Sequence, residues 1–281
     1  MKTILLPVDD YPPGGSTIDT AAQLALTFGS YVEGFHLTAE LPLLAPADPF
    51  TGAMISPPPD SNALTERQRA SRDLFEDRLA ARGLVRDSAE GEKTASFAWR
   101  DADEALGRDF LGAYARVFDI TVLTRPQSVS DASRMGVLET ALFESGRPVL
   151  LAPPGHSKAL GENVLIAWNG TPEAARTVAF AKPLLHRARH VAVVTLSGDE
   201  SAEPGGEDLS RYLRRNGIAC EAREAAAAPE RGAAFLAEAE RLGSDLIIKG
   251  AYTQSRLRQM IFGGATRTIV TEATVPVLLA H

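Results

Sequence analysis

The chain of 281 residues contains a single cysteine, Cys220. One cysteine can form neither an intrachain disulfide nor a thiolate metal site, which is typical of a reducing compartment. No run of about 18 apolar residues, the length that spans a bilayer, is present. Met1–Asp10 is apolar for only a few residues before two aspartates, so we expect no signal peptide. We therefore expect a soluble, cytoplasmic protein with no membrane partner.

An excess of positive charge is also missing. Lys and Arg number 29 against 36 Asp and Glu, which gives a formal net charge of −7. Nucleic acids and anionic membrane surfaces require a positive footprint on the protein, so we expect neither as the main partner. The shares of hydrophobic (44%) and charged (23%) residues are ordinary for a globular protein and exclude a wholly disordered chain.

What the sequence does contain is an internal repeat. Thr3–Leu26 and Asn163–Ala179 share the same pattern: a short apolar run, a polar turn and an Ala-rich helical segment. Asp9 and Asn169 correspond in these segments, at an offset of 160 positions. A repeated pattern of this kind indicates that the chain is built from two similar units.

Two further matches lie later in each half. Phe118–Leu123 corresponds to Ser244–Lys249, and the ending Arg147–Pro153 corresponds to Val275–His281 at an offset of 128. The order of the three matches is the same in both halves. We therefore predict two domains, residues 1–154 and residues 160–281, of which the first carries 32 extra residues.

The extra residues begin in a Pro-rich insertion at 41–62, which we interpret as an extended loop. A charged, helix-favouring segment follows up to Arg82, and Gly83 is placed to end it. Two interpretations of the insertion stay open. It is either a lid over a cleft or an ordered surface excursion, because long loops cost little free energy.

Each half alternates strand and helix patterns. In the second half we predict strands at 163–168, 190–196, 219–224, 244–250 and 275–280, and helices near 171–187, 206–216, 229–242 and 263–273. Strands such as Asp245–Lys249 are continuously apolar rather than alternating, as expected for parallel strands covered on both faces. Strand–helix alternation forces right-handed crossovers. The predicted fold is α/β, with two tandem doubly wound five-stranded parallel sheets.

Ligands of doubly wound sheets bind beyond the carboxyl ends of the strands. This places a candidate site in the loop after the fourth strand of the second half, which begins at Gly250 and returns to the pair Gly263–Gly264. Glycines allow close backbone approach, and a helix N-terminus attracts anions. The loop is neither a GxGxxG nor a Walker A motif, so a phosphate site and plain turn glycines both stay open. Three cations lie in or near it: Arg256, Arg258 and Arg267.

The pattern Gly250-x2-Thr253-x9-Gly263-Gly264-x-Thr266, followed by the ending Val275–Leu279, resembles the universal stress protein family. Nucleotide-binding members of that family carry G-x2-G-x9-G-(S/T) between the fourth strand and the last helix. The resemblance covers the whole chain as two tandem copies. It implies the sheet order 3-2-1-4-5, with the two copies paired as an intrachain pseudo-dimer. Whether two chains also form a homodimer stays open.

The resemblance also implies a ligand, ATP or another adenine nucleotide in the second domain, with Mg²⁺ as a possible companion. Asn169 stands where the family often has aspartate, and Leu196 ends the strand that lines the adenine pocket. Thr253 replaces a family glycine, and Gly264 replaces the Ser/Thr that would meet phosphate. The candidate ligand-binding residues are Asn169, Gly170, Leu196, Gly250, Thr253, Arg256, Gly263, Gly264, Ala265 and Thr266.

The first half departs further from the pattern. Its loop at 124–136 holds one glycine, while Pro126 removes a backbone donor and Asp131 adds negative charge. We expect this half to be structural or to bind something other than a nucleoside triphosphate. The implied function is a stress-response binding and signalling module. The alternatives are a nucleotide-independent structural or interaction protein that has lost its ATP site, and a slow ATPase.

No catalytic or metal-binding set stands out. His186 and His190 are four residues apart, but no third ligand accompanies them at a recognisable spacing. Asp9 and Asp10 are interpreted as turn-forming carboxylates, with ribose or Mg²⁺ binding as the alternative. His36 is expected to be a pocket-wall or packed residue, and Cys220 a small buried residue in a strand.

Overall fold

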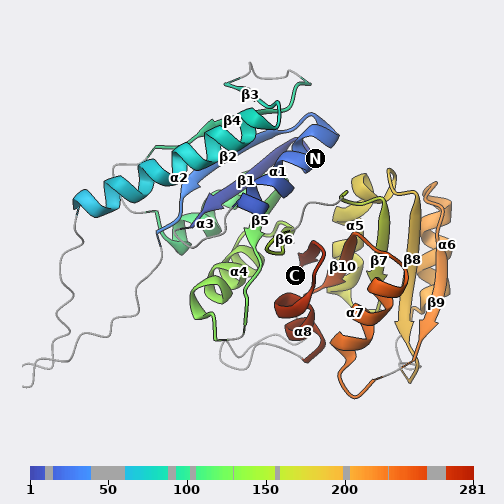
Figure 1. Ribbon diagram of the computed structural model, residues 1–281. Helices are drawn as coiled ribbons and strands as arrows, with labels where there is room; N and C mark the ends of the chain where they lie inside the picture. Colours follow the sequence, from blue (N-terminus) through green and yellow to red (C-terminus); the bar gives the residue numbers. More distant parts are fainter. Residues whose placement is uncertain are drawn as a thin grey trace, which may run out of the picture.

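The computed structural model shows an α/β protein built on one large sheet with helices on both faces (Figure 1). The residues that the structure describes are 1–9, 15–38, 61–87, 93–101, 106–128, 130–155, 159–198, 203–226, 228–251 and 264–281. Within them, no helix combines the length and apolar character needed to cross a membrane.

The elements of the first half are β1 (Thr3–Val8), α1 (Gly15–Phe28), β2 (Tyr31–His36), α2 (Ser61–Ala81), β3 (Val85–Arg86), β4 (Ser96–Trp99), α3 (Arg108–Tyr114), a 3-10 turn (Ala115–Val117), β5 (Ile120–Thr124), α4 (Ala132–Glu144) and β6 (Val149–Ala152). Those of the second half are β7 (Asn163–Ala167), α5 (Pro172–Leu185), β8 (His190–Leu196), α6 (Gly206–Arg215), β9 (Glu221–Ala225), α7 (Arg231–Arg241), β10 (Leu246–Gly250), α8 (Gly264–Glu272) and β11 (Val277–Ala280). The strands and helices predicted for the second half are confirmed, with ends shifted by at most two residues.

The described strands form a single sheet in the order β3-β4-β2-β1-β5-β6-β11-β10-β7-β8-β9. Neighbouring strands are parallel except at the centre, where β6 and β11 pair antiparallel with Leu150 opposite Leu278. The α/β fold with parallel strands is therefore confirmed. The two groups of strands are not separate sheets, however, because the apolar endings of both halves pair edge to edge (Figure 1). The domain boundary at 154–160 stays a prediction.

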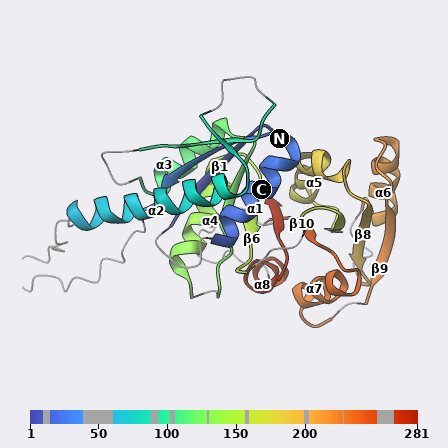
Figure 2. The ribbon, with the colours of Figure 1, turned by 45° about the horizontal axis from the view of Figure 1, so that its top comes forward.

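Helices cover the sheet on both faces. Successive strand residues point to opposite sides, so Ile4 and Leu6 pack with α1 and α2, whereas Leu5 packs on the other face with α3 and α4. In the second half α5 and α6 share the face of α1 and α2, and α7 and α8 share the face of α3 and α4. Figures 1 and 2 both show α8 between α4 and α7. Burial on both faces explains why the central strands are apolar throughout, whereas the edge strands β3 and β9 are not.

A repeated aspartate fixes the start of the first strand in each half. The carboxylate of Asp245 accepts hydrogen bonds from the backbone N–H groups of residues 161–163 at 2.8–3.1 Å. Asp119, its counterpart in the repeat, accepts from the backbone N–H of Thr3 at 3.2 Å. Burial raises the pKa of Asp245, and the three backbone donors oppose that rise. The sequence repeat is therefore also a repeat of contacts.

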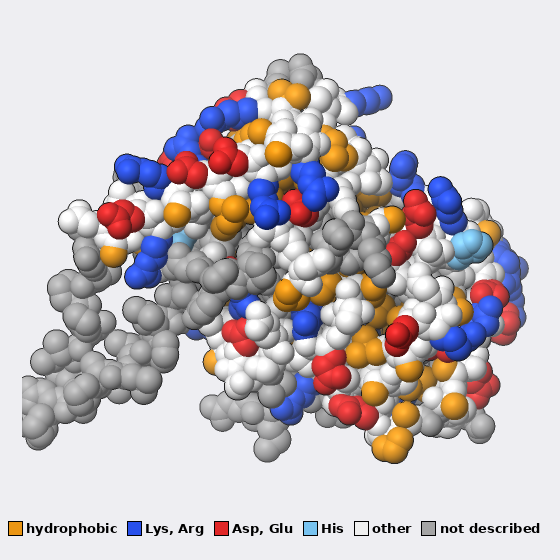
Figure 3. All heavy atoms as spheres, in the orientation of Figure 1, with side chains coloured by type: hydrophobic (Ala, Val, Ile, Leu, Met, Phe, Trp, Pro, Cys, Tyr) orange, Lys and Arg blue, Asp and Glu red, His pale blue; other side chains and the backbone are white. Residues whose placement is uncertain are grey.

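Helix α2 packs on the sheet through a narrow apolar stripe. Phe75 and Leu79 are fully buried, and a Cβ added at Gly34 would lie 2.5 Å from the Phe75 ring. The outer side of α2 is charged, with Arg72 paired to Glu76 at 2.9 Å, and Figure 3 shows both signs of charge interspersed there. Because α2 begins at Ser61, the last two positions of the predicted insertion belong to the helix. The other residues of the insertion, 41–60, lie outside the described ranges.

The prediction for Cys220 is wrong in two respects. Cys220 lies just before β9 rather than in a strand, and its side chain is half-buried rather than buried. The reason is that β9 is an edge strand of the sheet in which no residue is fully buried, and it begins at Glu221, after Cys220. Burial still raises the pKa of the Cys220 thiol, against the opposing effects of its hydrogen bond to Ser210 and of Arg214.

Candidate functional site

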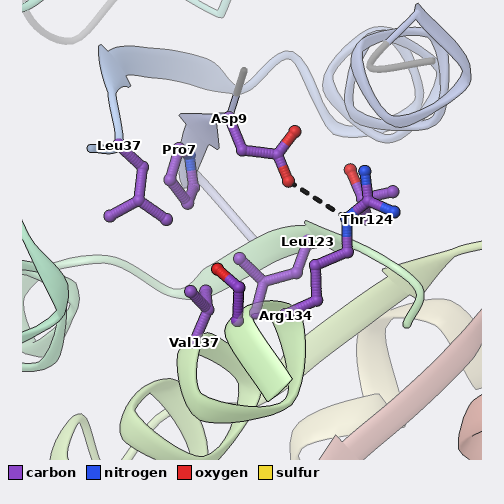
Figure 4. Close-up of a pocket in the computed structure, with 8 residues that line it drawn as sticks. Pro7, Asp9, Leu37, Leu123, Thr124, Arg134 and Val137 are labelled. Carbon is purple, nitrogen blue, oxygen red and sulfur yellow. Dashed lines mark hydrogen bonds and ion pairs between the residues drawn. The ribbon is translucent and has the colours of Figure 1, made fainter. Parts of the chain in front are cut away.

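At the carboxyl edge of the first half, the turn after β1 faces the first turn of α4. Arg134 donates from Nε to Oδ2 of Asp9 at 3.2 Å, as Figure 4 shows. A second carboxylate, that of Asp131, lies 3.6 Å from Arg134 and also accepts from its backbone N–H, which caps α4. The Arg134 side chain is only 7% exposed. The ligand position expected from the fold therefore holds a protein ion pair.

A cavity of about 20 Å³ remains beside this ion pair, room for about one water molecule. Its lining residues are Pro7, Asp9, Leu37, Leu123, Thr124, Ser133, Arg134 and Val137. Two carboxylates and one guanidinium at this point repel a polyphosphate on balance. That the first half is structural or binds something other than a nucleoside triphosphate stays a prediction.

In the second half, the turn after β7 carries no charge. The Asn169 side-chain oxygen accepts from the Thr171 hydroxyl at 3.0 Å, and Thr171 caps α5 by accepting from the backbone N–H of Ala174 at 3.3 Å. Pro172 occupies the first turn of the helix, so the predicted helix start is confirmed. Gly170 has φ +70°, a left-handed conformation that favours glycine. The turn thus presents a half-buried amide where the first half presents Asp9.

Gly250 lies at the end of β10, in contact with the start of α5. A Cβ added there would lie 2.3 Å from the backbone nitrogen of Ala174. No side-chain rotation can relieve this contact, because the atoms that the added Cβ would meet belong to the backbone of Glu173 and Ala174. Packing between β10 and α5 therefore requires glycine at this position, whether or not a ligand approaches it.

The other predicted residues divide into two groups. Leu196 ends β8 and is 2% exposed within the core. Gly264, Ala265 and Thr266 form the first turn of α8, where Gly264 is exposed with open space at its Cβ position and Thr266 is buried. The structure thus brings Asn169, Gly170, Leu196 and Gly250 to one edge of the sheet. Three predicted residues lie outside the described ranges: Thr253, Arg256 and Gly263.

One residue of this region was missed from the sequence. Lys249 was interpreted as the end of an apolar strand, but its side chain is buried among apolar groups, 5% exposed. Its ammonium lies 5.8 Å from the centre of the Phe235 ring. Burial, together with the nearby positive charge of Arg231, lowers the pKa of Lys249 to about 8. Strand alternation puts Lys249 on the same face as Ile247, but only the packing of α7 on that face shows that the lysine is buried.

The histidines singled out in the sequence lie in different elements of the described structure. His36 is a packed residue, as expected, with Nδ1 2.9 Å from the Ser71 hydroxyl. His186 ends α5 and His190 begins β8. Among the described residues no three His, Cys, Asp or Glu side chains gather closely enough to hold a metal ion.

Comparison with known proteins identifies the fold. No family model matches the sequence, and no curated protein matches it. A universal stress protein from Archaeoglobus fulgidus DSM 4304 is 16% identical with a TM-score of 0.73, over 99% of this chain and 95% of that one. A putative universal stress protein from Pseudomonas aeruginosa UCBPP-PA14 is 14% identical with a TM-score of 0.55, over 100% and 93%.

A third solved structure shows that a protein with a different description has a similar fold. The cytoplasmic domain of a prokaryotic cation chloride cotransporter is 13% identical with a TM-score of 0.50, over 99% of this chain and 94% of that one. The chain therefore has the fold of the universal stress proteins over nearly its whole length. Because one fold serves several functions, the function has to be argued from the site.

Proposed function

We propose that this protein is a tandem binding and signalling module of the universal stress protein type, whose second half binds an adenine nucleotide. The observation that carries this proposal is the contrast between the two halves. Arg134 and Asp9 fill the expected ligand position in the first half, whereas the matching turn of the second half presents the uncharged Asn169. An uncharged amide beside a helix N-terminus is compatible with an anionic ligand.

Each part of the site would contribute one kind of contact. Leu196 supplies an apolar wall for the base, and the Asn169 amide can bond the ribose hydroxyls. The first backbone N–H groups of α8 would donate to a phosphate. The described residues offer no metal-binding cluster, so we propose Mg²⁺ only as the counterion that a di- or triphosphate brings. Occupancy would alter a surface that partners contact.

Calorimetric titration with ATP, ADP and AMP tests the proposal. We expect one site per chain, and Asn169→Leu is expected to weaken binding about tenfold, the effect of losing one or two hydrogen bonds. Asp9→Asn in the first half is the matched control and should leave nucleotide affinity unchanged. The absence of heat at millimolar nucleotide, or two sites per chain, would contradict the proposal.

A second candidate function is favoured by the centre of the sheet. Val149–Ala152 and Val277–Ala280 are fully buried and pair with each other, so the apolar endings of both halves are used to join them. This pairing supports an intrachain pseudo-dimer and is also what a nucleotide-independent structural or interaction protein needs. The same titration separates the two candidates, because only the first predicts nucleotide-dependent heat.

A further inference from the structure

Lys249 is a buried cation in an apolar layer. Its sheet neighbours are Ala167 of β7 and Leu279 of β11, neither of which carries a charge. The ring of Phe235 from α7 covers the ammonium. Within the described part of the chain, no carboxylate forms an ion pair with Lys249, and the one charged group that shifts its pKa is the cation Arg231.

The charged groups around Lys249 do not offset its charge. On α7, Arg231 is positive, and the carboxylate of the preceding Glu230 accepts the Thr268 hydroxyl of α8 at 2.5 Å. The first turns of α7 and α8 lie against each other, because a Cβ added at Gly232 would lie 2.8 Å from the Ala265 carbonyl oxygen. Helix N-termini carry positive partial charge. These helix starts therefore add positive partial charge beside the negative charge of Glu230.

The position of Lys249 in the repeat ties it to the candidate site. Its counterpart is Leu123, which lines the first-half cavity beside Asp9 and Arg134 (Figure 4). Lys249 also directly precedes Gly250, at the carboxyl end of β10. The first half thus combines its cation with two carboxylates, whereas the second half has a cation on the strand and an amide at Asn169.

Burying a lysine side chain that has no ion pair among the described residues is costly, and lysines are almost never fully buried without a partner. We propose that Lys249 pairs with a phosphate of the ligand and makes the second-half site selective for anionic ligands. This inference rests on the nucleotide site proposed above and adds the residue that recognises the charge. A ligand phosphate supplies the counter-charge that the described residues lack.

The test compares wild type with Lys249→Met, which keeps the length of the side chain and removes its charge. Calorimetry with adenosine, AMP and ATP at pH 7 measures selectivity. Wild type is expected to bind AMP about tenfold more tightly than adenosine, the size of a buried charge-assisted contact. Lys249→Met should lose this advantage and keep its affinity for adenosine. Lys182→Met, a half-buried α5 lysine that bonds Asn216 at 3.0 Å, is the control and should bind like wild type.

Thermal unfolding with inorganic tripolyphosphate keeps the two proposals distinguishable. If nucleosides and nucleotides fail to bind but tripolyphosphate stabilises wild type and not Lys249→Met, the anion site stands and the nucleotide proposal fails. Equal effects of AMP and of tripolyphosphate on both proteins would overturn the role of Lys249. No binding of any anion to wild type would also overturn it. Lys249→Leu, the residue of the first half, replaces Lys249→Met if that variant does not fold.

Discussion

The guanidinium of Arg134 lies 3.2 Å from the carboxylate of Asp9 and closes the carboxyl edge of the first half. At the equivalent edge of the second half, Asn169 replaces the acid and Lys249 supplies a cation from the strand itself. The two halves share one backbone pattern but carry different charges at the place where this fold binds ligands. Substitutions at these charged positions should therefore change the stability of each half in a different, measurable way.

Arg134→Ala is expected to lower the free energy of unfolding by about 1–3 kcal/mol, because Asp9 and Asp131 lose a buried cationic partner. Urea unfolding measures this. Arg211→Ala is the control, since the Arg211–Asp208 pair is largely exposed and its loss should cost less than about 1 kcal/mol. Equal losses in both variants would contradict a structural role for the Arg134 pair.

Gly250→Ala and Gly264→Ala should have opposite effects on the melting temperature. The added methyl at Gly250 meets the backbone of α5 at 2.3 Å, and overpacking of this kind costs about 1–3 kcal/mol. At Gly264 the methyl enters open space at the first residue of α8, where alanine should be better than glycine by less than the roughly 0.5–1 kcal/mol found within helices. Thermal unfolding followed by circular dichroism checks the pair. A neutral Gly250→Ala would show that α5 can move away from β10.

Lys249→Met should raise the free energy of unfolding at pH 7, by on the order of 3 kcal/mol if the whole pKa shift is recovered. The pKa of Lys249 is lowered from 10.5 to about 8 in the native protein. Between these values the unfolded chain binds more protons than the native one, so wild-type stability rises with pH there. The cost of the buried charge is fully present below about pH 8.

The gap between Lys249→Met and wild type should therefore narrow as the pH rises above about 8. Urea unfolding of both proteins at pH 7, 8 and 9.5 measures it, and the difference between them cancels the titration of other groups. A gap that stays constant over this range would mean that the native ammonium titrates like an exposed lysine.

Asp245→Ala should destabilise the protein more than Asp119→Ala. Asp245 is buried and accepts from three backbone N–H groups, whereas Asp119 is half-buried. Unpaired buried donors cost about 1–3 kcal/mol each, so we expect Asp245→Ala, which removes the acceptor of three donors, to cost at least about 3 kcal/mol. Chemical denaturation compares the two variants, and the reverse order would show that these turns relax and find water.

Much of the fold was predictable because its signals are local. Thr171 followed by Pro172 predicts the start of α5, and Gly217 and Gly243 end helices with the positive φ expected of them. The continuously apolar strands predicted burial on both faces, which the structure confirms. The repeat itself placed the counterparts Asp119 and Asp245, whose contacts are also repeated.

The site was less predictable because its contacts are distant in sequence. Asp9 and Arg134 are separated by 125 positions, and no local pattern connects them. Lys249 was overlooked because a single charge at the end of an apolar run looks like the end of a strand. Its burial depends on α7, which packs on the face of β10 that Lys249 shares with Ile247.

The sequence by itself determined the elements, their order and the repeat, since these depend on periodicity and turn chemistry within short segments. Tertiary structure alone decided that the apolar endings pair antiparallel into one sheet, that Arg134 fills the first-half site, and that Lys249 is buried at the second. Charges acquire their partners, or lack them, only when strands far apart in the chain come together.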